Sequence, residues 1–78
     1  MNFYEKEKEI KTKYNEPIGA ISEANHVDMD IAYSMFKANV TKGAKYSYKS
    51  YKEAEELAKK DFEELHRIAE SEVMPTVK

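Results

Sequence analysis

The chain has 78 residues, and its composition combines 36% charged residues with no cysteine and a formal net charge of −2. This length allows one domain with a thin core, because a chain of this size buries only about 60% of the surface that it exposes when unfolded. Disulfides and cysteine-based metal sites are excluded, so helix packing or association with a partner has to supply the stability. A second copy of the chain, forming a homo-oligomer, is one such partner.

No apolar run approaches the roughly 20 residues that a transmembrane helix needs. The N-terminal sequence also lacks the apolar stretch of a secretory signal. We therefore expect a cytoplasmic protein that does not associate with membranes.

The hydrophobic periodicity predicts a mainly α fold, a small helical domain of about four helices with a long C-terminal helix. In residues 3–14, the side chains of Phe3, Ile10 and Tyr14 recur on one face of a helix. No internal repeat or flexible linker divides the chain, so we expect residues 1–78 to form a single domain.

Two further helices are marked by residues that start and stop helices. Asn15 is placed to cap a helix over residues 15–26, with Pro17 in the first turn, where the amide hydrogen that proline lacks has no helical partner. Asp28 is a good N-cap for the next helix, and Gly43 can end it in the left-handed conformation that glycine adopts easily.

The long helix is predicted to begin at Ser50, because Ser50 and Glu53 match a capping box. Apolar residues then recur at steps of three and four positions and form a stripe along one face. The stripe consists of Ala54, Leu57, Ala58, Phe62, Leu65, Ile68, Ala69 and Val73. A strict heptad fails because Asp61 and Glu72 interrupt the seam, which favours ordinary packing over a coiled coil. Just upstream, the alternation in residues 44–49 indicates either an extended loop or one short edge strand.

We predict that the core forms where this stripe meets the preceding helix. The predicted core contacts join Leu57, Phe62, Leu65 and Ile68 to Ile31, Met35 and Phe36. The solvent-exposed side of the long helix has three acidic and basic pairs at i,i+4 spacing, which are Glu55–Lys59, Glu56–Lys60 and Glu63–Arg67.

The sequence contains no pattern of catalytic residues. Nucleophilic catalysis needs an activated group beside a base, and a metal site needs several converging ligands. His26, Asp28 and Asp30 occupy alternate positions, but a turn followed by an N-cap explains them better than a metal does. Gly19 and Gly43 are isolated, so no phosphate-binding loop is present. We expect no enzymatic activity, no metal and no cofactor.

Residues 18–36 have the spacing of a helix-turn-helix, with His26 standing where such a turn usually has glycine. A recognition helix has to approach a polyanion, whereas this helix opens with Asp28 and Asp30. A plain helical hairpin is therefore favoured over a DNA-binding motif, and both interpretations stay open.

Charge is distributed unevenly along the chain: residues 1–30 carry a net charge of −3, residues 31–52 carry +5, and residues 53–78 carry −4. Tyrosines are interleaved with the lysines of the basic segment. Such a segment can track a phosphate backbone, anchor a protein interface, or turn its tyrosines into the core. The predicted partner-binding residues are Lys42, Lys45, Tyr46, Tyr48, Lys49, Tyr51 and Lys52.

These features together predict a small non-enzymatic interaction protein. We expect a regulator, adaptor or inhibitor that binds another protein through the lysine- and tyrosine-rich segment and one face of the long helix. Chains of this size and composition are typical products of bacteria, and particularly of phages or other mobile elements. The alternatives are a nucleic-acid-binding regulator that uses residues 37–52 and a small self-assembling structural subunit.

Overall fold

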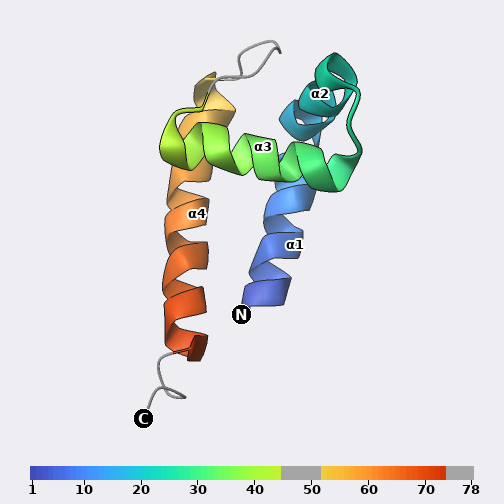
Figure 1. Cartoon of the computed structure of the whole chain (residues 1–78). Coiled ribbons are helices and arrows are strands. Elements are labelled where there is room, and N and C mark those ends of the chain that lie inside the picture. The colour runs from blue at the N-terminus through green and yellow to red at the C-terminus, as the bar shows by residue number, and fades with distance from the viewer. Residues whose placement is uncertain (45–51, 74–78) are drawn as a thin grey trace.

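The computed structural model describes residues 1–44 and 52–73, and this part of the chain consists of four helices without a strand. They are α1 (Phe3–Lys13), α2 (Asn15–Asn25), α3 (Met29–Lys42) and α4 (Lys52–Val73). Figure 1 shows α1 and α4 side by side in opposite directions, with α3 lying across α4 and the junction of α1 with α2. The predicted mainly α, four-helix fold is confirmed. The predicted capping box at Ser50 and all but the first residue of the predicted strand lie outside the described residues.

The long helix α4 spans much of the molecule. Its 22 residues extend over about 33 Å at 1.5 Å per residue, and the longest dimension of the molecule is 44 Å. None of the described helices combines the length and the apolar character needed to cross a lipid bilayer.

A single residue separates α1 from α2. The backbone amide of Tyr14 donates to the carbonyl of Ile10 in α1, and the carbonyl of Tyr14 accepts from the amide of Ile18 in α2. The prediction that Asn15 caps α2 is wrong, because Asn15 is already the first residue of that helix. Since Tyr14 belongs to the hydrogen-bonding pattern of both helices, no separate polar cap is needed between them.

The connections on either side of α3 agree with the predicted helix signals. His26 ends α2 in the left-handed conformation, with φ at 56°, which is uncommon for residues other than glycine. The carboxylate of Asp28 accepts a hydrogen bond from the first turn of α3, as predicted for an N-cap. Gly43 ends α3 with φ at 71°, also as predicted. These two ends fix the length of α3.

The apolar core lies where α3 crosses the other helices. It is built from Ile10, Tyr14, Ile18, Ile21, Ala32, Tyr33, Phe36, Val40, Ala58, Phe62 and Leu65. Phe36 is fully buried, with its ring centroid 5.7 Å from that of Tyr14 and 6.1 Å from that of Phe62. Aromatic rings at such distances attract each other beyond the effect of burial alone. Phe36 of α3 therefore joins the junction of α1 and α2 to α4.

The predicted core is confirmed in part. Phe36, Phe62 and Leu65 are buried, but Ile31 is 49% exposed and Leu57 is 55% exposed. Each of the two lies one position, about 100° around its helix, from a fully buried alanine that faces the core. The two alanines, Ala32 and Ala58, take the inward places that the prediction gave to the larger side chains.

Candidate protein-binding groove

The partner-binding residues predicted from sequence lie at one end of the molecule as far as the structure describes them. Lys42 is the last residue of α3 and Lys52 is the first residue of α4, and both are exposed. The remaining predicted residues lie outside the described part of the chain. They are Lys45, Tyr46, Tyr48, Lys49 and Tyr51.

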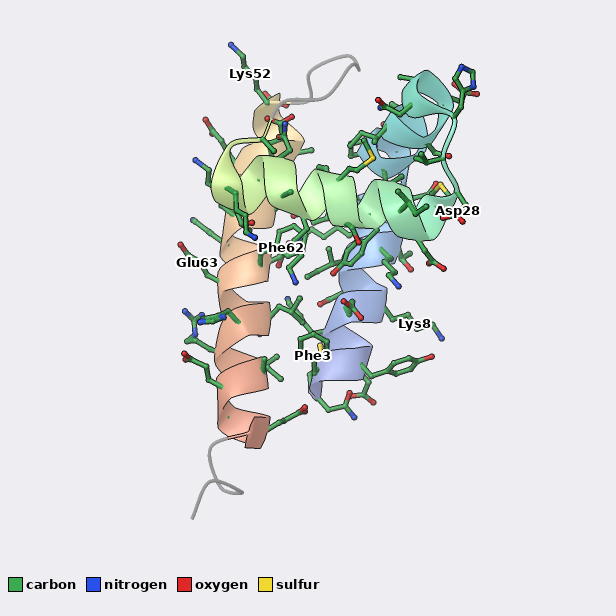
Figure 2. All side chains as sticks on the ribbon, in the orientation of Figure 1. Phe3, Lys8, Asp28, Lys52, Phe62 and Glu63 are labelled. Atoms are coloured by element: carbon green, nitrogen blue, oxygen red, sulfur yellow. The ribbon has the colours of Figure 1, made fainter. Side chains whose placement is uncertain are left out.

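A groove of about 600 Å³ lies between the C-terminal half of α3, the first turn of α1 and one face of α4. Its apolar lining consists of Phe3, Val40, Phe62, Leu65 and Ala69. Its polar lining consists of Lys37, Thr41, Lys59, Glu63, His66 and Arg67. In Figure 2 the labelled Phe62 and Phe3 lie on the side of α4 that faces α1, whereas Glu63 lies at the opposite edge of α4. The groove thus has an apolar floor and a charged rim.

The floor of the groove is continuous with the core. Val40, Phe62 and Leu65 are core residues that are at most 5% exposed, and Phe3 packs against the core as a partly buried residue. The backbone amide of Phe3 donates a hydrogen bond of 2.9 Å to the carboxylate of Glu72 in the last part of α4. This bond holds the beginning of α1 against α4 and fixes the position of Phe3 at one end of the groove.

The rim of the groove is predominantly cationic. Lys37, Lys59 and Arg67 form no ion pair with any residue in the described ranges 1–44 and 52–73. The carboxylate of Glu63 is the rim's acidic group, and the predicted ion pair between Glu63 and Arg67 is not formed. This prediction is wrong because helical spacing only makes such a pair available, and exposed pairs gain little. His66 contacts Glu70 at 3.2 Å.

A second set of charges, which was not identified from the sequence, lies where α4 packs against α1, away from the charged rim of the groove. Lys6 in α1 is 5% exposed, and its ammonium group lies 3.1 Å from Glu9, 3.1 Å from Asp61 and 3.0 Å from Glu64. Asp61 also accepts hydrogen bonds from Lys13 at 3.1 Å and from the Tyr14 hydroxyl at 2.5 Å. We call these residues, from α1, Tyr14 and α4, the Lys6–Asp61 cluster.

Burial and hydrogen bonding act in opposite directions on the charges of this cluster. Burial by itself would lower the pKa of Lys6, but hydrogen bonds to the Glu64 carboxylate and to two further carboxylates outweigh it and raise that pKa. Burial would likewise raise the pKa of Asp61, yet hydrogen bonds from Tyr14 and from two ammonium groups hold it below its ordinary value. The pKa of Tyr14 is raised by burial and then by its bond to Asp61.

The chemistry of the cluster is structural. A lysine becomes a nucleophile or a general base only in its neutral form, and a raised pKa keeps Lys6 protonated at neutral pH. One sequence signal did mark the cluster: Asp61 and Glu72 interrupt the apolar seam of α4, and both bond to α1. Polar interruptions of an otherwise apolar stripe can therefore identify the positions where a neighbouring helix brings a donor.

Within the described part of the chain, no group of three histidine, aspartate or glutamate side chains is arranged to hold a metal ion. Comparison of the chain with models of protein families, with characterised proteins and with solved structures gives no match. The assignment of function therefore rests on the groove and on the charges around it.

Proposed function

We propose that the chain is a small non-enzymatic interaction protein, a regulator, adaptor or inhibitor that binds another protein through this groove. The observation that carries the proposal is the combination of an apolar floor with rim cations that form no ion pair among the described residues. Binding energy in protein interfaces concentrates in well-packed apolar pockets, and the charges around them steer association. The groove offers both features on one face.

The position of the groove extends the surface predicted from sequence. Lys37 and Thr41 belong to the last turns of α3, directly before the predicted partner-binding residue Lys42. Lys59 lies two turns after Lys52 on α4. In this proposal the groove is the face of the long helix that binds the partner, and the exposed Lys42 and Lys52 belong to the same two helices that line it.

A protein partner explains the charges better than a nucleic acid does. Glu63 lies within the rim itself. A uniform phosphate backbone would be repelled by this carboxylate, whereas a protein with mixed charges can match it. The second candidate, a nucleic-acid-binding regulator, is favoured by the three rim cations together with Lys42 and Lys52 and is separated from the first by experiment.

The proposal is tested by capturing partners with the tagged full chain from cells of the organism that encodes it, with and without nuclease, followed by mass spectrometry. We expect a protein that is retained after nuclease treatment and recovered less well by the Arg67→Glu variant. The matched control is Lys8→Glu, which reverses an exposed charge on α1 away from the groove (Figure 2). Recovery that depends wholly on nucleic acid would contradict the proposal.

A direct titration supports the capture experiment. Fluorescence anisotropy with random duplex and single-stranded DNA and RNA at physiological ionic strength measures non-specific affinity, for which ordinary binders show dissociation constants of roughly 10⁻⁴–10⁻⁶ M. We expect dissociation constants above this range, which means weaker binding. Micromolar or tighter binding that Lys37→Glu and Lys42→Glu abolish would favour the nucleic-acid-binding regulator.

A further inference from the structure

We infer that the groove receives an acidic segment of the partner protein that inserts one large apolar side chain between its carboxylates. The inference rests on the proposed function and adds the chemistry of the partner.

The floor selects a large apolar side chain. The cavity of about 600 Å³ lies within the range of volumes that ligand-binding pockets have, roughly 300–1,000 Å³. Phe3 and Ala69 are partly buried and leave apolar surface accessible at one end, while Phe62 and Leu65 form a packed base. An aromatic or long aliphatic side chain would remove this surface from water. Such a residue is the usual anchor of an interface.

The rim selects carboxylates. The rim contains Lys37, Lys59 and Arg67 against one carboxylate, that of Glu63, so it has a cationic excess although the whole chain has a net charge of −2. A cation that forms no ion pair with the described residues has no such pair to give up when a carboxylate from another chain binds it, and complementary charge raises the rate of association. An acidic segment is therefore the partner whose charge complements the rim.

The spacing of two rim cations sets the length of that segment. Lys59 and Arg67 lie eight residues apart on α4, which corresponds to about 12 Å along the helix axis. An extended peptide covers this distance in about four residues, at 3.3 Å per residue. Two acidic residues with about three residues between them could contact both cations, and the apolar anchor would lie between these contacts.

A second copy of the chain is a weaker candidate for this groove. Leu57 is exposed and follows the exposed Glu53 and Glu56, so the chain does present an acidic apolar segment of its own. Leu57 lies on a different face of α4 from the groove, however. Its insertion into the groove of another copy would be a head-to-tail contact. Such contacts build an open filament unless the rotation between successive copies closes a ring.

The test is a selection of binding peptides from a displayed random library, with the purified full chain at physiological ionic strength. We expect the selected peptides to carry net negative charge and one large apolar residue. For a selected peptide, Arg67→Glu should raise the dissociation constant about tenfold. Glu63→Gln should lower it about two- to fivefold, because it removes the rim's carboxylate. Lys8→Glu should leave it unchanged.

The gain expected for Glu63→Gln protects the test against misfolding, because a damaged fold would not bind more tightly. Selected peptides without an excess of carboxylates, no selected peptides, or equal losses for Arg67→Glu and Lys8→Glu would each overturn the inference. Self-association in sedimentation experiments that both Leu57→Ala and Arg67→Glu abolish would also overturn it, by assigning the groove to a second copy. Failure of the proposed function itself would be recognised separately, by recovery of nucleic acid alone in the capture experiment.

Discussion

Cations lie on two sides of α4, and they differ in burial and in ion pairing. On the side that faces α1, the ammonium groups of Lys6 and Lys13 bond to Asp61, and Lys6 is almost completely buried. On the side that faces the end of α3, Lys59 and Arg67 are exposed and form no ion pair within the described residues. The first pair of cations belongs to the fold, and the second pair is available to a partner.

The difference shows how burial decides what a charged residue does. A buried ammonium group loses its hydration and has to be matched by carboxylates, as Lys6 is by three of them. An exposed cation keeps its hydration, so the fold tolerates it without a partner. We therefore expect substitution of the cations on the α1 side of α4 to lower stability. Substitution of the cations on the groove side should weaken partner binding and change stability little.

The largest expected effect lies between the two sides, at Phe36. Phe36→Ala should lower the free energy of unfolding by about 3–5 kcal/mol, because it leaves a cavity at a fully buried site. Urea denaturation measures this loss. Leu57→Ala is the control at a site that the sequence placed in the core and the structure leaves 55% exposed. Equal losses for the two variants would contradict the described core.

The next effect concerns the α1 side of α4. Lys6→Ala should lower the free energy of unfolding by about 2–4 kcal/mol, because it removes a buried ammonium group from its carboxylates together with the packed stem of the side chain. Lys8→Ala, at an exposed position two residues later, should change it by less than about 0.5 kcal/mol. A similar loss for both lysines would mean that Lys6 is not buried in solution.

The Lys6–Asp61 cluster should also make stability depend on pH at both extremes. The folded state lowers the pKa of Asp61, so the stability that this group contributes is present above its unfolded pKa of about 3.9 and is lost as the pH falls through the lower folded value. The folded state raises the pKa values of Lys6 and Tyr14. Their contributions are complete below the unfolded values of about 10 and are lost as the pH rises through the folded values.

Urea midpoints measured across the pH range check this dependence. In Asp61→Asn the loss at acid pH should be smaller than in the wild-type chain, because the titrating carboxyl is gone. If the variant and the wild-type chain lose stability in parallel below pH 4, the cluster is not responsible for the acid sensitivity.

Sequence reasoning identified the helices better than their contacts. The caps at Asp28 and Gly43 were predicted because they depend on local chemistry that a few neighbouring residues supply. The cap at Asn15 was wrong because Tyr14 takes part in both helices, and Leu57 was misplaced because the stripe of α4 is wider than the face that α3 covers. Periodicity gives the apolar side of a helix, whereas the position of the neighbouring helix decides which part of that side is buried.

The groove was less accessible to sequence reasoning than the helices were. Its rim combines Lys37 from α3 with Lys59 and Arg67 from α4, and only the packing of the two helices brings these residues to one place. The i,i+4 spacing of Glu63 and Arg67 even suggested that Arg67 is paired. The one available clue was the assignment of the partner to a face of the long helix.

A smaller loss of stability is expected at the N-cap of α3, which lies on neither side of α4. Asp28→Ala should lower the free energy of unfolding by about 0.5–2 kcal/mol, because the carboxylate of Asp28 accepts a backbone amide of α3 at 3.0 Å. Asp30→Ala is the matched control, since the Asp30 side chain is 92% exposed and its contact with Lys11 is 4.0 Å long. Thermal or urea denaturation would show whether the two aspartates differ. Equal effects would remove the case for a cap at Asp28.

The most direct test of the separation between the two sides is the stability of the Lys59→Ala/Arg67→Ala double variant, measured by urea denaturation beside Lys6→Ala. We predict that the double variant keeps the free energy of unfolding within about 0.5 kcal/mol of the wild-type chain, because both side chains are exposed and have no ion-pair partner among the described residues. A loss in the double variant as large as that in Lys6→Ala would contradict the account, because the groove cations would then serve the fold.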